Sequence, residues 1–144
     1  MIRIGEAADA TGLTPRAIRY YEEVGLLRPA AHVSGGNRRY DAEDLERLLL
    51  IKQLRDVVGL SLAEIHTFLE TEEERQALRR EYHATNDPQR QADLLDRVEP
   101  VLHRRIALLE HKLAAVQALL DEERARLERT HAPRAQHTLE TLTV

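Results

Sequence analysis

Two arginines and a tyrosine stand close together near the N-terminus, at Arg16, Arg19 and Tyr20. At about 100° of rotation per helical residue these three share one face, while Ile18 and Tyr21 face the opposite way. A guanidinium group can bridge the edge of a guanine or clamp a phosphate, and a phenol can donate to a phosphate oxygen. The same face could instead be a solvated surface on which the arginines pair with neighbouring glutamates. An isolated helix favours the second interpretation, so the surrounding elements must decide.

Short, well-capped segments surround this face. Residues 4–10 predict a brief helix that stops at Gly12. Thr14 is placed to cap a second helix, Pro15 occupies its favoured first position, and the helix runs to about Val24. The sequence therefore predicts two short helices joined by a tight turn, with the arginine-bearing face on the second helix.

Residues 29–40 predict a β-hairpin, because short extended pieces flank the turn signal Ser34–Asn37. Arg38 and Arg39 lie beside its tip, where such a hairpin would straddle a DNA backbone. Two short helices followed by a hairpin form a winged helix-turn-helix, whose second helix enters the major groove. This context favours the DNA interpretation of the helix face over the solvated one.

Further helices follow the hairpin. Asp41 is placed to begin a helix that ends at Gly59. Ser61, with Glu64 three residues later, forms a capping box that opens the next helix. Thr71 offers a cap for another short, acidic helix.

A heptad pattern fills the C-terminal part of the chain. One apolar residue occurs every three or four positions, and one slot, Glu123, is lost to charge: Leu102, Ile106, Leu109, Leu113, Val116, Leu120 and Leu127. A helix of about 26 residues, roughly 39 Å long, with one narrow apolar stripe more often pairs with another chain. We therefore interpret the residues from Leu102 to Leu120 of this stripe as a dimerisation surface. Packing of the stripe on segment 71–97 of the same chain is the alternative, and the direction of pairing cannot be read from the sequence.

The expected organisation is mainly α. A winged helix-turn-helix DNA-binding domain occupies residues 1–70, and a helical linker, the expected place of any response to an effector, occupies 71–100. A coiled-coil dimerisation helix follows over 101–129, and a flexible tail over 130–144. Pro100 would stand in the first turn of the long helix, or at a kink in a longer one.

The order of these motifs resembles the N-terminal signature of the MerR family of transcription regulators. The resemblance covers residues 2–70 with nearly standard spacing, and three runs carry most of it: IGEAA at 4–8, GLTPRAIRYYE at 12–22 and GLL at 25–27. GNRRY at 36–40 resembles the first wing; LRD at 54–56 and GLSLAEI at 59–65 resemble the third helix, second wing and fourth helix. Many members have a single residue where this chain has Val57 and Val58.

The resemblance implies a two-fold homodimer, joined by antiparallel C-terminal helices, that binds an inverted repeat in double-stranded promoter DNA. Such regulators occupy the spacer between the polymerase recognition elements and distort it, so RNA polymerase is an indirect partner. At the matching positions the resemblance implies groove and backbone contacts from the second helix and a phosphate contact from Arg38, with Tyr40 chiefly supporting the wing from inside. The candidate DNA-binding residues are Thr14, Pro15, Arg16, Arg19, Tyr20, Arg38, Arg39 and Tyr40.

Other chemistries find little support. The chain has no cysteine, which excludes disulfides, thiolate metal sites and thiol redox switches. Its seven histidines show no ligand spacing, so we expect neither a metal nor a cofactor. MerR-like metal sensors generally rely on cysteines, which favours an organic effector or a protein partner. No phosphate loop, nucleophile elbow or carboxylate cluster indicates an enzyme, and no catalytic residue is expected.

Charge leaves one competing class open. The net charge is −4, which argues against nucleic-acid binding, although the acidic excess lies entirely in residues 63–144. The alternative is a coiled-coil dimeric adaptor whose head binds protein rather than DNA. No apolar run approaches the roughly 20 residues that span a bilayer, and the N-terminus lacks a signal peptide, so we expect a cytoplasmic protein without membrane contact. The effector, the operator and the sign of regulation are left open.

Overall fold

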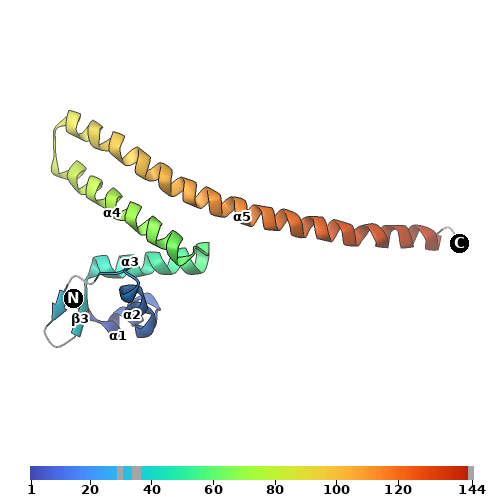
Figure 1. Cartoon of the computed structure of the whole chain (residues 1–144), viewed down its shortest axis with the longest axis horizontal. Helices are drawn as coiled ribbons and strands as arrows, with labels where there is room; N and C mark the ends of the chain where they lie inside the picture. The colour runs from blue at the N-terminus through green and yellow to red at the C-terminus, as the bar shows by residue number, and fades with distance from the viewer. Residues whose placement is uncertain (29–30, 34–36, 143–144) are drawn as a thin grey trace. The chain divides into compact units, whose positions relative to one another are not determined.

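The computed structural model describes residues 1–28, 31–33 and 37–142, with side chains for 1–28 and 37–134 (Figure 1). The turn signal at 34–36 lies outside these residues. The chain divides into two units, Met1–Val101 and Leu102–Val144. Helices dominate both units, as the sequence predicts.

The first two helices form the expected helix-turn-helix, α1 (Ile4–Thr11) and α2 (Pro15–Glu23). The turn between them closes at Gly12, whose φ of 68° lies in the left-handed region that favours glycine. A Cβ at this position would also lie 2.7 Å from the Nζ atom of Lys52, which donates to the Thr11 carbonyl at 3.1 Å. A glycine at position 12 therefore allows Lys52 to satisfy a carbonyl at the end of α1.

A three-stranded antiparallel sheet packs beside these helices, in the order β1 (Ile2–Arg3), β3 (Asn37–Tyr40) and β2 (Ala31–Val33). The predicted hairpin is confirmed by the pairing of β2 with β3. Strand β1 was not predicted, because two residues are too few to show a strand period. It pairs with β3 so that Ile2 lies opposite Tyr40, which ties the N-terminus to the wing.

The helix expected between Asp41 and Gly59 has two parts, α3 (Ala42–Gln53) and a π-helical turn, η1 (Leu54–Val58). Asp41 caps α3 as predicted, accepting from the Asp44 N–H at 2.9 Å. A π turn contains one residue more than an α turn at the same place. The turn accommodates the doubled Val57 and Val58, and Gly59, with φ of 75°, ends it.

Helix α4 (Leu62–Ala84) begins at the predicted capping box, where the Ser61 Oγ accepts from the Glu64 N–H at 3.2 Å. The predicted cap at Thr71 is wrong. Thr71 is buried in the middle of α4, and its hydroxyl donates to the Phe68 carbonyl at 2.6 Å. Because threonine can bond back to the preceding turn, it can lie within a helix as well as at its start.

Helix α5 (Pro88–Leu142) is much longer than expected. Its first turns pack on α4 through a small core of Leu78, Leu94 and Val101, flanked by Tyr82 and Val98. Pro100 stands inside this longer helix, not in a first turn, and the boundaries expected after residues 100 and 129 do not end an element. Helix continues to Leu142, and the flexibility expected of residues 130–144 stays a prediction. A proline removes one backbone donor, and here the helix formers on both sides keep the helix continuous.

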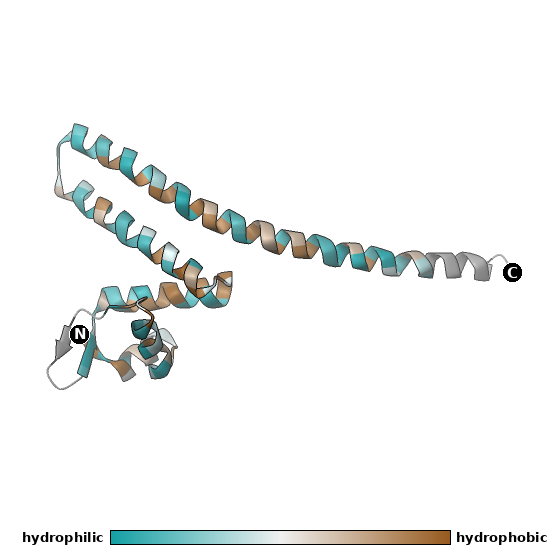
Figure 2. Cartoon of the chain, in the orientation of Figure 1, coloured by the Kyte–Doolittle hydropathy of each residue, from teal (hydrophilic) through white to brown (hydrophobic). Residues whose placement is uncertain are grey.

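Polar residues interrupt every helix of the described segments, and none of these helices has an apolar stretch long enough to cross a bilayer. Figure 2 shows the mixture of hydrophilic and hydrophobic residues along α4 and α5. The fold is thus a winged helix-turn-helix head followed by helices α4 and α5. The first turns of α5 pack on α4, and the rest of α5 carries the heptad pattern.

Candidate nucleic-acid interface

Helix α2 has the two-sided character that its sequence predicts. Ile18 is fully buried and Tyr21 is 3% exposed, whereas Arg16, Arg19 and Tyr20 are exposed. Among the residues whose side chains are described, neither arginine has a hydrogen-bond or ion-pair partner. Arg16 and Arg19 therefore do not pair with the neighbouring glutamates, and their guanidinium groups remain available to a ligand.

The start of α2 is fixed by Thr14 and Pro15. The Thr14 hydroxyl oxygen accepts from the Ala17 N–H at 3.1 Å, and Pro15 occupies the first helical position. Both residues therefore position the helix end at which Arg16 lies. Both are also exposed, so the contacts expected of them remain predictions.

A buried glutamate joins α2 to the wing. The Glu22 side chain is 6% exposed, and its Oε1 atom accepts from the Tyr40 hydroxyl at 2.6 Å. Its second carboxylate oxygen, Oε2, forms an ion pair with the Arg38 guanidinium. Tyr40 is fully buried, and burial raises the pKa of its phenol. The recognition helix and strand β3 are thus held together by one carboxylate.

This junction bears on two expectations for the wing. Tyr40 is fully buried and supports the wing from inside, and the DNA contact expected of it stays a prediction. Arg38, expected to be a phosphate contact, is 37% exposed and already paired with Glu22. Arg39 follows it on β3, partly buried and opposite Arg3 and Ala31.

A second junction joins α2 to η1. The Arg55 guanidinium donates to both oxygens of Asp56, at 2.6 and 3.0 Å, and also to the Tyr21 hydroxyl. It lies 5.7 Å from the centre of the Tyr21 ring. The hydrogen bond from Arg55 lowers the pKa of Asp56, and burial raises the pKa of Tyr21. The turn η1 is therefore fixed to the inner side of α2.

The sequence interpretation missed both junctions. Glu22 is one of the neighbouring glutamates that the solvated-surface alternative would pair with the arginines, although it lies four residues after Ile18 and so on the inner face. The position of Glu22 on the inner face, together with Arg38 in a downstream strand, could have predicted that this carboxylate joins α2 to the wing. Arg55 carried no such signal, because its contact with Tyr21 joins residues 34 positions apart.

Residues 2–72 match the family model described as MerR HTH family regulatory protein. Over 139 residues the chain is 30% identical to the HTH-type transcriptional regulator YfmP of Bacillus subtilis, covering 96% of this chain and 98% of that protein. The chain belongs to the MerR family. The expected class, a MerR-type transcriptional regulator with a winged helix-turn-helix head, is confirmed, and no comparison favours a protein-binding adaptor.

The match to other MerR-type regulators is strongest in the head. The chain is 47% identical over 75 residues to the uncharacterized HTH-type transcriptional regulator PA4778 of Pseudomonas aeruginosa, covering 52% of this chain and 56% of that protein. A solved structure with similar fold is the transcription regulator PbrR691 from Ralstonia metallidurans in complex with lead(II), at a TM-score of 0.51 and 27% identity. That match covers 85% of this chain and 81% of the other.

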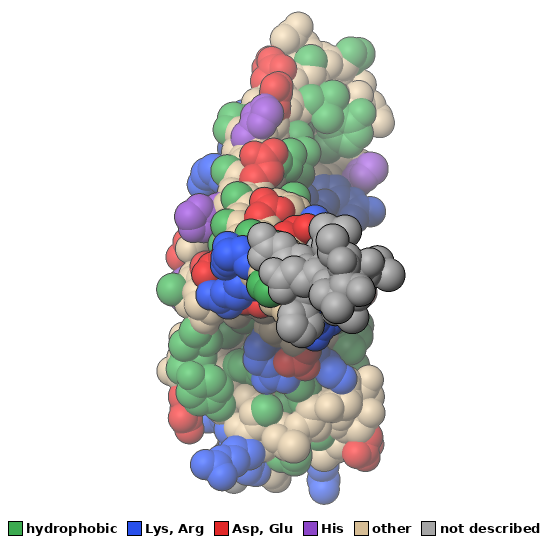
Figure 3. Space-filling view, turned by 90° about the vertical axis from the view of Figure 1, so that its right-hand side faces the viewer, with side chains coloured by type: hydrophobic (Ala, Val, Ile, Leu, Met, Phe, Trp, Pro, Cys, Tyr) green, Lys and Arg blue, Asp and Glu red, His purple; other side chains and the backbone are tan. Residues whose placement is uncertain are grey.

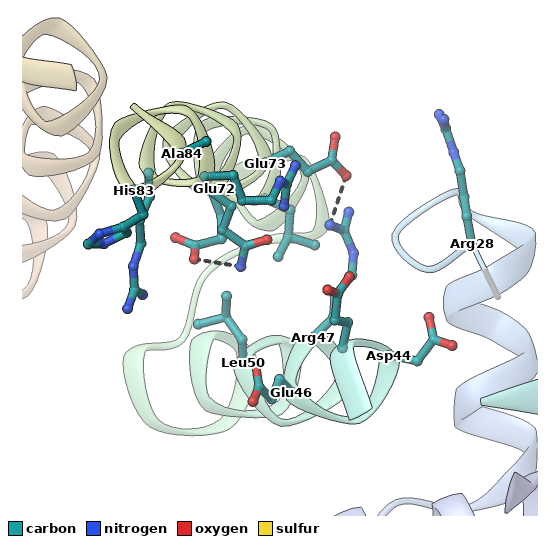
Figure 4. Close-up of a pocket in the computed structure, with 14 residues that line it drawn as sticks. Arg28, Asp44, Glu46, Arg47, Leu50, Glu72, Glu73, His83 and Ala84 are labelled. Carbon is teal, nitrogen blue, oxygen red and sulfur yellow. Dashed lines mark hydrogen bonds and ion pairs between the residues drawn. The ribbon is translucent and has the colours of Figure 1, made fainter. Parts of the chain in front are cut away.

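This MerR-family chain also has a groove of about 850 Å³ between α3 and α4 (Figure 4). Arg47 crosses it, donating from Nε to the Leu26 carbonyl at 2.5 Å and pairing with Glu73 of α4 at 2.8 Å. Arg28 lies at one side of the groove in Figure 4, and Glu72 lines it from α4. Arg47 therefore connects α4 to the segment that directly follows the recognition helix.

The charge on one face of the molecule is mixed. On the face drawn in Figure 3, basic and acidic side chains are interspersed with hydrophobic ones rather than forming a broad basic surface. No group of three or more His, Cys, Asp or Glu side chains suited to a metal ion occurs within the described segments.

Proposed function

We propose that this chain binds promoter DNA as a homodimer, with the α2 helix of each copy in one half-site of an inverted repeat. The observation that carries the proposal is the face of α2, on which Arg16 and Arg19 are exposed and unpaired beside the half-exposed Tyr20. Unpaired guanidinium groups at the start of a helix-turn-helix recognition helix are suited to base edges and phosphates.

The three side chains have different roles in this proposal. Arg16 lies in the first turn of α2, where side chains reach base edges most easily, and it specifies sequence. Arg19 and Tyr20 lie further along the helix and bind the sugar-phosphate backbone, which fixes position without reading sequence. The wing, through Arg38 and Arg39, adds backbone contacts on the side where Glu22 holds it.

Dimerisation is assigned to α5. The seam residues are all substantially exposed in the single chain: Leu102 41%, Ile106 48%, Leu109 39%, Leu113 66%, Val116 55% and Leu120 41%. In the described part of the chain the packing of α5 on α4 reaches Val101, so this stripe begins where the intramolecular core ends. A second copy of the helix would bury it. Held in this way, two heads would distort the promoter spacer and act on RNA polymerase indirectly.

The effector is proposed not to be a thiophilic metal. The structural relative PbrR691 was solved with lead(II), but this chain has no cysteine to supply thiolate ligands. An organic molecule or a protein partner is the proposed alternative. DNA binding should then be unchanged by stoichiometric mercury or copper salts and by reductant, and a reversible response to reductant alone would contradict this assignment.

Operator binding by Arg16→Ala tests the DNA-binding proposal. We expect a loss of about 1–3 kcal/mol on the operator, with relaxed selectivity at one base pair per half-site. Titrations on operator and scrambled duplex across a salt series measure both quantities. The matched control is Arg97→Ala, an exposed arginine of α5 with no assigned contact. If Arg16→Ala and Arg19→Ala both bind like the control, the α2 face is only a solvated surface.

A further inference from the structure

The groove between α3 and α4 is large enough to hold a small organic molecule. Its volume of about 850 Å³ lies within the roughly 300–1,000 Å³ of typical small-molecule sites. Leu50 of α3 and Leu69 of α4 give it an apolar lining, and Leu50 points from α3 toward α4 in Figure 4. Every residue that lines the groove belongs to the unit Met1–Val101, so the groove is a feature of one compact part of the chain.

Charged side chains of both signs line the remainder of the groove. They are four arginines, one histidine and five acidic residues. Glu43 and Glu46 contribute carboxylates from α3, while Arg79 and Arg80 contribute guanidinium groups from α4. A ligand of one charge would meet repulsion as well as attraction in this groove, whereas a ligand with both charges can match both kinds of group.

These four side chains do not neutralise one another. All four are exposed, and among the residues whose side chains are described none of the four has a hydrogen-bond or ion-pair partner. By contrast, the two acidic residues that line the groove from α4 are both ion-paired. The groove therefore offers unpaired positive and negative groups on two different helices, together with an apolar lining.

We propose that the groove binds a small zwitterion, an organic molecule with an amine at one end and a carboxylate at the other, which acts as the effector of this regulator. This inference rests on the proposed function and adds the site and the chemical class of the effector. The amine donates to the Glu43 and Glu46 carboxylates. The carboxylate of the ligand accepts from Arg79 and Arg80, whose planar guanidinium groups suit paired hydrogen bonds. The carbon chain between the two charges packs on the apolar lining.

Arg47 connects the groove to the recognition helix. Its guanidinium group pairs with Glu73 of α4 at 2.8 Å, and its Nε atom donates at 2.5 Å to the carbonyl of Leu26, shortly after the end of α2. The Arg47 side chain is only 23% exposed, and these two contacts hold it in place. A ligand that joins α3 to α4 favours one spacing of the two helices, and Arg47 carries the change to the segment after α2. Occupation of the groove thereby alters operator binding.

Simple zwitterions test the site without DNA. The probes are ε-aminocaproate and the shorter γ-aminobutyrate, and hexylamine and hexanoate each carry only one of the two charges. Titration of the isotope-labelled full-length chain, followed by NMR, should shift backbone amides at 43–50 and 69–84. At least one zwitterion should bind roughly threefold or more tightly than either single-charge compound. Equal binding of all four compounds, or shifts elsewhere only, overturns the inference. A groove filled by a second copy of the chain would admit none of them, and that result overturns it as well.

The arginine wall is tested by Arg79→Gln/Arg80→Gln. This variant should bind the better zwitterion roughly threefold or more weakly than the natural chain, because the ligand carboxylate loses both guanidinium groups. Both positions are exposed, so the variant should fold normally. The matched control is Arg124→Gln/Arg129→Gln, which changes two exposed arginines that do not line the groove. Equal binding by variant and control contradicts the assignment of the carboxylate.

The acidic wall is tested in the same way. Glu43→Gln/Glu46→Gln should weaken binding of the zwitterion by a similar factor, because the amine loses both anions. Glu110→Gln/Glu128→Gln makes the same charge change at exposed positions of α5 that do not line the groove. A groove variant that binds like this control would show that the amine does not contact α3.

The effect on DNA is measured separately. The better zwitterion, at saturation, should change the affinity of the natural chain for its operator by about fivefold or more. Glu73→Gln removes the ion pair of Arg47 at a side chain that is 61% exposed, so it should still bind the zwitterion while its operator affinity no longer responds. A bound zwitterion that leaves the operator affinity of the natural chain unchanged overturns the role as effector. Failure of the natural chain to bind any operator without a probe would instead overturn the proposed function, and the NMR titration distinguishes the two failures.

Discussion

The head and the C-terminal part of α5 use their side chains in opposite ways. In the head, hydrogen bonds connect distant residues: Tyr40 to Glu22, Arg47 to Leu26 and Lys52 to Thr11 are separated by 18, 21 and 41 positions. Along α5 after Val101, side-chain bonds reach three or four residues, as from Arg126 to Glu122 and Glu123.

This difference shows which partner each region needs. The head pairs polar side chains such as Tyr40, Glu22 and Arg38 with one another and leaves cationic groups exposed on α2, where a polar, anionic partner could bind. The α5 seam leaves its leucines exposed in the single chain, where an apolar partner could bury them. We expect the head to keep its fold without a second copy, whereas the seam is buried only by association.

The largest effect should come from charging the seam. Leu109→Asp/Leu113→Asp should convert the dimer to a monomer at low micromolar concentration, because each buried leucine contributes about 1.5–3 kcal/mol. Sedimentation equilibrium measures the mass. Ala114→Asp/Ala118→Asp, exposed and outside the seam, is the matched control and should remain dimeric. If the seam variant remains dimeric like its control, the interface lies elsewhere, and the seam does not depend on a second copy.

Breaking the Glu22 junction should have the next largest effect. Glu22→Ala leaves the buried Tyr40 hydroxyl without its acceptor and Arg38 without its anion, at a cost of about 1–3 kcal/mol in the free energy of unfolding. Urea midpoints at fixed protein concentration measure this loss. Glu23→Ala, an exposed neighbour on α2, should change the midpoint little. Equal midpoints for the two variants would show that the head does not depend on this carboxylate.

Arg38→Ala sharpens the contrast further, because Arg38 takes part in both the fold and the expected DNA contact. Its removal should lower stability by about 1 kcal/mol and weaken binding to operator and random duplex alike. A double-mutant cycle between Arg38→Gln and Glu22→Gln, read by urea unfolding, isolates the coupling of the pair. Additive effects in that cycle would mean that Arg38 acts on DNA alone.

The smallest effect should appear at alkaline pH. Burial raises the pKa of Tyr40, so the folded chain keeps this proton after the unfolded chain has lost it. The corresponding stability is present below the ordinary tyrosine pKa of about 10 and is lost as pH rises beyond it. Above that value the urea midpoint of the natural chain should fall more steeply than that of Tyr40→Phe. Parallel curves for the two proteins would contradict this assignment.

Features that depend on neighbouring residues were predictable from the sequence. The cap at Thr14, the box at Ser61 and Glu64, and the heptad of α5 all arise from short-range geometry, and all are observed. The exposed face of α2 was predictable for the same reason. The Glu22 and Arg55 junctions were not, because each joins residues that only the tertiary fold brings together.

The wrong boundaries have a common cause. Thr71 was interpreted as a helix cap, Pro100 as part of a first turn or as a kink in a longer helix, and Thr130 as the start of the tail. In each case the neighbouring residues favour helix, and the helix continues through the position. A single cap-like residue or proline is therefore weaker evidence for a boundary than a cap supported by glycine on its other side, as at Gly12 and Gly59.

The π-helical turn has a consequence for how chains of this kind change length. An extra residue inside an ordinary α-helix would rotate everything after it by about 100°. Here η1 absorbs the residue: the Leu60 N–H reaches back to the Leu54 carbonyl at 2.9 Å, and the box at Ser61 begins α4 normally. We therefore expect that deletion of one valine at this site would change η1 and leave the apolar face of α4, beginning at Ile65, in its present orientation.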